Sequence, residues 1–266
     1  MIKLISWNVN GRTGSALERQ ADALRDEGPH LVCLQEITAG SEPDWRDRLD
    51  ASALPHIFCS TGLIGPGRRY ANLIASRWLL AALPAGEFEI PYPEKVLSAV
   101  VAAPTTAIEL HNAHLPPGVS RPVQKLETFE GIFARLARPA LRPRILCGDF
   151  NTPQAEREDG TIETWASNHR ELAERWEQAE GSVLRDLRDH DLADAYRTLK
   201  GYDQHPTSYL PHGSTPKRRR YDHIYASESA QSARCGYLEA WREDGLSDHA
   251  PVWVELEHPH EPPPPS

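Results

Sequence analysis

Short apolar runs recur along this chain, and several of them end in polar side chains. The runs predict strands at residues 2–8, 31–35, 71–76, 96–103, 107–113, 144–148, 222–226 and 250–256. Apolar residues at helical spacing predict a helix over 16–26 and a second one over 122–136, and we also expect helices in the charged stretch 152–190. Strands and helices that alternate in this way indicate an α/β fold.

Polar side chains stand directly after some of these strands. After the strand at 144–148, Gly148 allows a sharp backbone turn that delivers Asp149 and Asn151 to a sheet edge. Comparable polar residues occur at three other places: Asn8, Glu36 and the pair Asp248-His249. Because functional sites of α/β proteins commonly lie at such edges, we expect these side chains to form one site.

Six motifs in a fixed order resemble those of the endonuclease/exonuclease/phosphatase superfamily, which includes exonuclease III-like repair nucleases, pancreatic-type deoxyribonucleases, sphingomyelinases and inositol polyphosphate 5-phosphatases. The motifs are Trp7-Asn8-Val9-Asn10-Gly11, Leu34-Gln35-Glu36, His111-Asn112-Ala113-His114, Gly148-Asp149-Phe150-Asn151, Tyr221-Asp222-His223-Ile224 and Ser247-Asp248-His249-Ala250-Pro251. The resemblance covers residues 2 to about 256. It implies a four-layer α/β sandwich of two facing mixed β-sheets flanked by helices, with the active site at one end.

The resemblance also implies a phosphoric ester hydrolase that depends on Mg²⁺ or Mn²⁺. Magnesium prefers oxygen ligands and is commonly held by one or two carboxylates. Glu36 is the principal metal ligand that the family pattern implies, with Asn8 and Asp248 as its companions. The plain structural alternatives are a strand-end glutamate paired with a lysine and an asparagine that caps a turn.

The remaining motif residues take catalytic roles by the same resemblance. Asp149 orients or deprotonates the attacking water, and Asn151 holds a phosphate oxygen or Asp149 itself. His249 stabilises the phosphoryl oxygens as a cation, and Asp222 is the carboxylate that keeps it charged. The alternatives are an Asx-turn after the strand and a histidine packed in the core.

His114 is the residue that best distinguishes the subgroups of the superfamily. Exonuclease III-like members usually carry a tyrosine in this segment, whereas secreted deoxyribonucleases, sphingomyelinases and 5-phosphatases use a histidine. A histidine can protonate the leaving oxygen near neutral pH. The chain departs from the repair nucleases here, which leaves its substrate open.

Two basic runs beside the motif strands are candidates for phosphate binding, Arg68-Arg69-Tyr70 and Lys217 to Arg220. Such runs are also common in solvated loops. The substrate-binding residues that we predict are Arg69, Asn72, Asn112, Arg218 and Arg219. Tyr70, Tyr209 and Tyr221 are available to stack on bases or to pack in the core.

Composition sets limits on partners and location. The 266 residues, 39% of them hydrophobic, predict one domain over 1–257 and a Pro-rich disordered tail over 258–266. With a net charge of −9, the chain must attract a polyanion through a local basic patch. We expect free cysteines, no membrane span and a cytoplasmic location; the oligomeric state stays open.

These observations favour a metal-dependent phosphodiesterase that cleaves DNA or RNA, with nucleic acid as its partner. The first alternative is a phosphatase or phosphodiesterase that acts on a small phosphate ester, such as a nucleotide, an inositol phosphate or a phospholipid headgroup. The second is a non-catalytic scaffold. The complete motif set argues against the scaffold, because an inactive copy would have no reason to keep every one of these residues.

Overall fold

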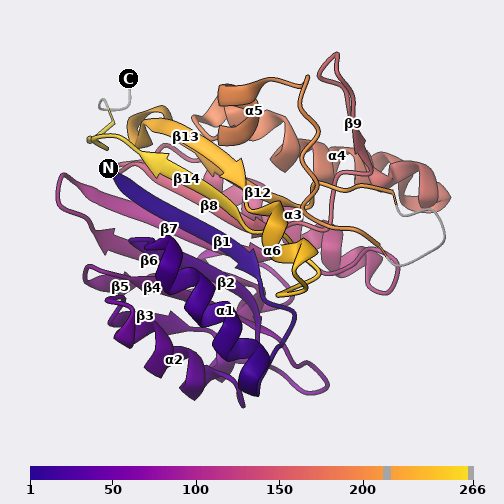
Figure 1. Cartoon of the computed structure of the whole chain (residues 1–266). Helices are drawn as coiled ribbons and strands as arrows, with labels where there is room; N and C mark the ends of the chain where they lie inside the picture. The colour runs from indigo at the N-terminus through magenta and orange to yellow at the C-terminus, as the bar shows by residue number, and fades with distance from the viewer. Residues whose placement is uncertain (212–216, 263–266) are drawn as a thin grey trace.

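Two six-stranded mixed sheets face each other in this protein, and helices cover their outer faces (Figure 1). The computed structural model describes residues 1–211 and 217–262. The first sheet has the order β13-β14-β1-β2-β4-β3, with β1 (Ile2–Asn8), β2 (Leu31–Ile37), β3 (His56–Cys59), β4 (Ala71–Ser76), β13 (Ser232–Tyr237) and β14 (Val252–Leu256). The second has the order β11-β12-β8-β7-β6-β5, with β5 (Leu80–Ala82), β6 (Val96–Ala102), β7 (Ala107–His114), β8 (Arg144–Asp149), β11 (Ala193–Asp194) and β12 (Asp222–Ala226).

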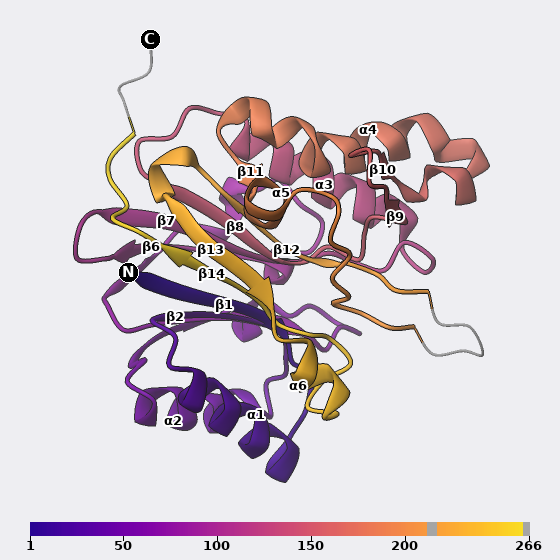
Figure 2. The ribbon, with the colours of Figure 1, turned by 45° about the horizontal axis from the view of Figure 1, so that its top comes forward.

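Helices connect the strands and form the outer layers, as Figure 2 shows. The α-helices are α1 (Gly14–Glu27), α2 (Glu42–Ala51), α3 (Pro122–Leu136), α4 (Ala173–Leu184), α5 (Ala195–Lys200) and α6 (Glu239–Glu243). Short 3-10 helices are η1 (Thr61–Leu63), η2 (Ala85–Glu87), η3 (Pro93–Lys95), η4 (Trp165–Asn168), η5 (Arg170–Leu172), η6 (Asp186–His190) and η7 (Glu228–Ala230). A small hairpin, β9 (Ala155–Glu156) with β10 (Ile162–Glu163), precedes α4.

The same unit occurs at the centre of both sheets. β1 and β2 run parallel and are joined by α1, while β7 and β8 run parallel and are joined by α3. Parallel neighbours need such a crossover, and it places the carboxyl ends of both strands at one edge of the sheet. Asn8, Glu36, His114 and Asp149 lie at or next to these four carboxyl ends. The same strand-helix-strand geometry, present once in each sheet, therefore places these four predicted site residues at the strand ends.

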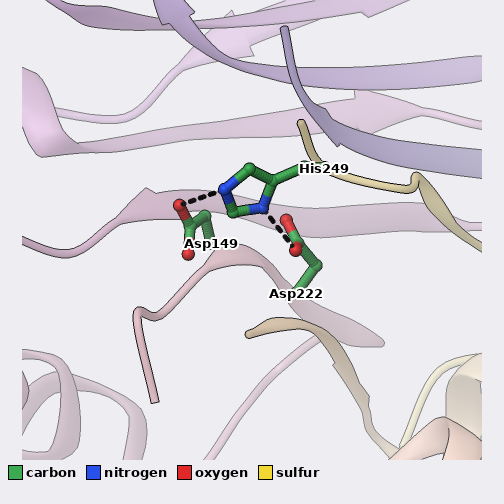
Figure 3. A group of neighbouring side chains, drawn as sticks. All are labelled: Asp149, Asp222 and His249. Carbon is green, nitrogen blue, oxygen red and sulfur yellow. Dashed lines mark hydrogen bonds and ion pairs between the residues drawn. The ribbon is translucent and has the colours of Figure 1, made fainter. Parts of the chain in front are cut away.

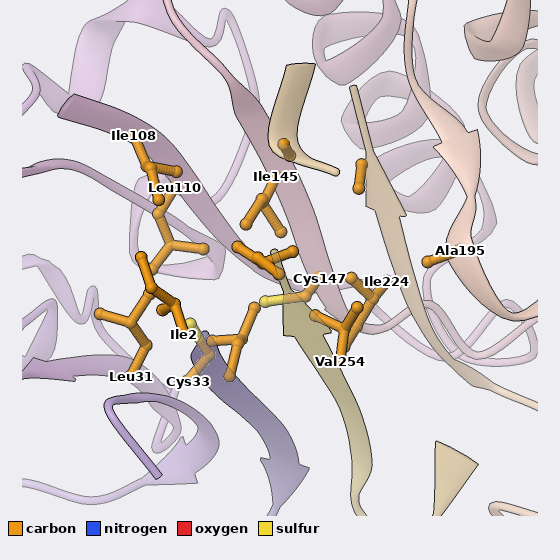
Figure 4. Close-up of a cluster of buried hydrophobic side chains, with 14 of the residues drawn as sticks. Ile2, Leu31, Cys33, Ile108, Leu110, Ile145, Cys147, Ala195, Ile224 and Val254 are labelled. Atoms are coloured by element: carbon orange, nitrogen blue, oxygen red, sulfur yellow. The ribbon is translucent and has the colours of Figure 1, made fainter. Parts of the chain in front are cut away.

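Three apolar clusters hold the layers together. One lies between the sheets and includes Leu31, Cys33, Leu110, Ile145 and Val254 (Figure 4). A second packs the outer face of the first sheet against Leu17 of α1 and Trp45 of α2, and a third packs the second sheet against α3 and α4. Side chains on successive strand residues point to opposite faces, so each central strand contributes to two clusters. This confirms the predicted four-layer sandwich.

Differences from the sequence-based expectations occur in the stretch 152–190, at the sheet edges and in the tail. The stretch 152–190 is only partly helical, because the hairpin, η4 and η5 precede α4. The helix α2 and the strands β3 and β13 were not predicted. The predicted tail begins differently as well: Pro259 is buried and the His260 amide donates to the Ser229 carbonyl, while residues 263–266 lie outside the described part of the chain.

Two remaining expectations concern cysteines and membranes. All four cysteines are free, and Cys33, Cys147 and Cys235 are buried, which confirms the prediction from their spacing. Over the described residues, no helix has both the length and the apolar composition that a bilayer crossing requires.

Candidate active site

The polar ends of four central strands, two from each sheet, meet at one end of the sandwich. Asn8 Nδ2 donates to Asp149 Oδ2 at 3.0 Å and to Glu36 Oε1 at 3.3 Å. His114 Nε2 lies 3.6 Å from Glu36 Oε1 and 3.9 Å from Asp149 Oδ2. Asn8 and His114 thus connect the carboxylates of the two sheets, and the expectation that these side chains form one cluster is met.

Backbone irregularities aim the two carboxylates into this cluster. Glu36 has a positive φ of 64°, and the pairing of β2 with β4 shifts register between Gln35 and Ile37. A bulge of this kind turns a side chain away from the regular alternation of the strand. At Gly148, φ is 142° and an added Cβ would stand 1.8 Å from the Ala113 carbonyl oxygen, so only glycine can precede Asp149 here.

The two oxygens of the Asp149 carboxylate, at the end of β8, have different partners. Oδ1 accepts the backbone N–H of Asn151 at 2.9 Å, which is the Asx-turn that the sequence left open. Oδ2 faces the cluster and accepts from Asn8. The Asn151 side chain donates to the Leu115 carbonyl at 2.9 Å, and buried Lys125 donates to the Asn151 carbonyl at 2.8 Å. The turn therefore fixes Asp149 while leaving one oxygen available.

His249 lies between two carboxylates, as Figure 3 shows. Its Nδ1 is 2.8 Å from Asp222 Oδ2, and its Nε2 is 3.8 Å from Asp149 Oδ2. Burial alone would lower the pKa of His249, but Asp222 and Asp149 outweigh it and raise this pKa to about 10. His249 is therefore a cation at neutral pH, with Nε2 directed toward Asp149.

Burial raises the pKa of the Asp149 carboxyl to about 7, although the positive charge of His249 acts in the opposite direction. Burial also raises the pKa of Glu36, and Asp248 adds to that rise. Carboxyl groups with raised pKa values in one pocket are typical of catalytic sites. A group that titrates near 7 is well matched to take a proton from water at neutral pH.

Lys95, at the end of η3, is a site residue that the sequence did not reveal. Its Nζ lies 3.0 Å from His114 Nδ1. Because an ammonium group only donates, Nδ1 accepts, and the neutral ring of His114 carries its hydrogen on Nε2. Burial, Lys95 and His249 lower the pKa of His114 well below its usual value, so His114 is a neutral donor, and its predicted transfer of a proton to the leaving oxygen would start from Nε2.

A pocket of about 440 Å³ opens over this cluster. Glu36, Lys95, His114, Asp149 and Asp248 lie in its wall, together with His249 and Asn151. Basic and aromatic side chains form the rest of the rim: Arg68, Arg69, Tyr70, Tyr92, Arg121 and Tyr209. Arg69 lies in this rim, and its contact with substrate stays a prediction. Two of the three tyrosines proposed for stacking, Tyr70 and Tyr209, also line the pocket.

Asn72 and Asn112 lie beneath the pocket, not in its wall, and both are fully buried. Asn72 Nδ2 donates to the carbonyls of Lys95 and Asn112, each at 2.9 Å. Asn112 donates to the carbonyls of Leu34 and Leu73 and accepts from Gln35. These amides link the two sheets, so the predicted substrate binding by Asn72 and Asn112 is corrected to a structural role. Asn72 also holds the Lys95 carbonyl.

The arginines of the basic run at 217–220 were expected to bind phosphate, but they do not line the pocket. Arg220 is buried and pairs with Glu156 and Asp194, at 2.6 and 2.8 Å. Arg219 donates to the Gln154 carbonyl and stacks on Trp165, while Arg218 is exposed. None of the three is part of the pocket wall. Any contact of Arg218 or Arg219 with substrate would therefore lie outside the pocket.

A model of the Endonuclease/Exonuclease/phosphatase family matches residues 5–249. The chain belongs to this family. Its motif residues are those that converge at the strand ends, and the family's enzymes hydrolyse phosphoester bonds, so the protein is a phosphoester hydrolase of the endonuclease/exonuclease/phosphatase type.

Several solved structures share this fold. An AP endonuclease from Archaeoglobus fulgidus aligns with a TM-score of 0.75 at 18% identity, over 97% of this chain and 100% of that one. The 3′ phosphatase NExo from Neisseria, bound to a product DNA hairpin, aligns at 0.66 and 20%, over 97% and 100%. A humanized D. rerio TDP2 aligns at 0.66 and 16%, over 96% and 98%. At these identities the likeness establishes the fold.

The donor set of this family member fits a divalent cation. Asp149, Asp222 and His249 offer ligand atoms within 4.8 Å of one another. Within this group, however, His249 Nδ1 and Asp222 Oδ2 are already paired with each other at 2.8 Å. Glu36 and half-buried Asp248 share the pocket wall and repel each other, which a cation bound by their oxygens would relieve. The ion therefore fits better beside Glu36 and Asp248, next to Asn8.

The pairing of Asp222 with His249 leads to a testable pH dependence. His249 is charged below its pKa, so in the wild-type enzyme this charge persists up to about pH 10. In Asp222→Asn the burial of the ring dominates, and we expect the pKa of His249, followed by NMR titration of its ring, to fall by roughly 2–3 pH units. The titration should be unchanged in Asp47→Asn, whose side chain is exposed on α2. An unshifted His249 titration in Asp222→Asn would show that Asp222 does not keep this ring charged.

Proposed function

We propose that this protein is a divalent-metal-dependent phosphodiesterase that cleaves phosphodiester bonds of DNA or RNA. The observation that carries the proposal is the position of Asp149 Oδ2, which accepts from Asn8 and has His114 Nε2 and His249 Nε2 at 3.9 and 3.8 Å. A carboxylate acceptor surrounded by donors on the wall of an open pocket can deprotonate a water while the donors hold the attacked group.

In this proposal each residue has one task. Asp149 orients the attacking water and removes its proton. His249, charged through Asp222, stabilises the negative oxygens of the attacked phosphate. A Mg²⁺ or Mn²⁺ ion held by the carboxylates of Glu36 and Asp248 would supply further charge stabilisation. Asn8 donates to Glu36 while its Oδ1 accepts the Asn10 N–H, so Asn8 is assigned to orienting Glu36 in place of the ligand role expected from the sequence.

Departure of the leaving oxygen is assigned to His114 and Lys95. His114 gives its Nε2 hydrogen to the leaving oxygen, and its Nδ1 takes a hydrogen from Lys95 Nζ. Burial lowers the pKa of Lys95 to about 8, which favours the release of this proton near neutral pH. Lys95 and His114 thus pass one proton to the leaving oxygen, and the His114 ring need not become a free imidazolium.

A nucleic-acid substrate is supported by the rim of the pocket. In a chain with a net charge of −9, the rim gathers Arg68, Arg69 and Arg121 around the reacting groups. Tyr70 and Tyr209 offer ring faces on which a base can stack. The neighbouring folds include an AP endonuclease and a 3′ phosphatase bound to DNA.

Free cysteines also suit the cytoplasmic location that we propose.

The alternative substrate is a small phosphate ester. A pocket of about 440 Å³ is of the size that encloses a small ligand. His114 in place of a tyrosine favours this alternative as well, because the family's 5-phosphatases and sphingomyelinases resemble the chain at this position. A nucleotide or inositol phosphate would use the same reacting groups with fewer contacts at the rim.

Assays of the purified protein with magnesium or manganese would separate the two. We expect the wild-type enzyme to cleave an oligonucleotide. In a plot of log KM against log salt concentration, Arg69→Ala should have a slope lower by about one unit, because one phosphate contact is lost. Arg77→Ala, at the opposite end of β4, should keep the wild-type slope. Absence of oligonucleotide cleavage alongside efficient hydrolysis of a nucleotide or inositol phosphate would overturn the nuclease assignment.

A further inference from the structure

We propose that Arg68, Tyr92 and Arg121 form a second phosphate subsite beside the reacting position, so that the preferred substrate carries a second phosphate. This inference rests on the proposed function, because it needs a phosphate ester in the pocket. All three residues line the pocket that contains Asp149 and Lys95. The subsite would hold a phosphate that is not cleaved and would thereby place the one that is.

Arg68 is fixed in the pocket wall by a buried carboxylate. Its Nε lies 2.6 Å from Glu94 Oε1, and the Glu94 side chain is 0% exposed. A buried carboxylate is costly unless it is paired, so Glu94 strongly favours this position of Arg68. The guanidinium also stacks over the Tyr92 ring at 4.7 Å and packs on Gly65, where a Cβ would stand 2.1 Å from Nη2. Because Nε pairs with Glu94 and Nη2 packs on Gly65, these contacts leave Nη1 as the terminal nitrogen for a ligand.

Arg121 approaches the same tyrosine from the loop before α3. Its Nη1 donates to the Tyr92 hydroxyl at 2.7 Å, and its guanidinium carbon lies 5.7 Å from the ring centroid. Within residues 1–211 and 217–262, Arg121 makes no ion pair shorter than 4.0 Å. Tyr92 therefore brings together one arginine whose position is fixed and one whose charge is not neutralised.

Phosphate is the ligand chemistry that this arrangement fits. The two guanidinium groups together offer N–H donors to phosphate oxygens, since Arg68 Nη1 and Arg121 Nη2 are not used in the contacts above. Aromatic contact limits the conformations that each arginine must lose on binding. A carboxylate ligand would be served by either arginine alone. The second phosphate can come from the next unit of a nucleic-acid strand or from a small molecule with two phosphates, and the chemistry of recognition is the same.

Isothermal titration in the Asp149→Asn background with magnesium tests the subsite, because ligand then binds with little turnover. The probes are a thymidine dinucleotide without terminal phosphate, the same dinucleotide with a 5′- or a 3′-phosphate, and inositol mono- and bisphosphate. We expect one phosphorylated partner to bind about tenfold or more tightly than its parent, the effect of one or two charge-assisted hydrogen bonds.

Three further substitutions in that background identify the residues. Arg68→Met should reduce the affinity ratio to near one. Glu94→Gln should also reduce the affinity ratio, because Arg68 loses the carboxylate that holds it in place. Arg68 keeps its charge in this variant, so the loss of an arginine charge would not explain that result. Arg77→Met, outside the pocket, should keep the wild-type ratio, and thermal unfolding confirms that each variant is folded. A ratio near one for every pair, or a ratio that survives Arg68→Met, would overturn the subsite.

The outcome is distinguishable from failure of the proposed function. A preference confined to the inositol pair supports the subsite and assigns it to a small bisphosphate, whereas a preference within the dinucleotides assigns it to a strand. Failure of the wild-type enzyme to hydrolyse any phosphodiester would reject the proposed function, and the binding ratios would still decide the subsite.

Discussion

Replacing Asp149 with asparagine is expected to lower kcat by about 10²–10⁴-fold, the usual contribution of a general base. The substitution keeps the size of the side chain and removes the acceptor that takes the proton. The amide oxygen can still accept from the Asn151 N–H, so the Asx-turn and the loop after β8 should persist. Substrate affinity should change little, because Asp149 is assigned to the water.

Steady-state kinetics with a phosphodiester substrate and magnesium measure this effect. Asp47→Asn provides the matched control, since Asp47 is exposed on α2 and does not line the pocket. The control should retain wild-type kcat. If Asp149→Asn stays within a factor of a few of the wild-type enzyme, Asp149 is structural and another group activates the water.

Removing Glu36 should have the second large effect, through the metal. We expect a chelator to abolish turnover, magnesium or manganese to restore it, and Glu36→Ala to lose at least roughly 10²-fold in kcat/KM. The pKa of Glu36 is raised by burial and by Asp248, so its removal relieves repulsion and should not destabilise the fold. Loss of activity without loss of stability would locate the defect in the site.

A binding readout separates the metal role from catalysis. A ligand that binds only the folded state raises its stability, so magnesium should raise the melting temperature of the wild-type protein. This shift should disappear in Glu36→Ala and remain in Glu89→Ala, whose side chain is exposed. Full activity of the metal-stripped wild-type protein would end the metal assignment.

The strand ends were the part of the site that the sequence could predict. Asn8, Glu36, His114 and Asp149 each follow an apolar run, and Gly148 marked the turn that only glycine allows. Hydrophobic periodicity assigns such positions because side chains alternate across a strand. It does not say which inward-facing polar residue reaches a pocket, and so Asn72 and Asn112 were placed with the substrate although they link the sheets.

Other errors came from contacts that are distant in the sequence. Lys95 follows no motif, and its role appears only because η3 places it beside His114. Arg220 looked like a member of a basic surface run, but Glu156 and Asp194 bury it in an ion-pair network. The spacing of Trp45 and Leu49, four residues apart, was the available signal for α2. Pairings of this kind depend on tertiary structure, which one sequence does not contain.

Hydrolysis of a phosphodiester oligonucleotide in ¹⁸O-labelled water, with magnesium, tests the central claim most directly. The account predicts that the wild-type enzyme places the label on the product phosphate, because a water activated by Asp149 attacks phosphorus. Asp149→Asn, compared under single-turnover conditions, should produce labelled phosphate at a rate lower by about 10²-fold or more. Label absent from the phosphate, or labelled product formed equally fast by Asp149→Asn, would contradict it.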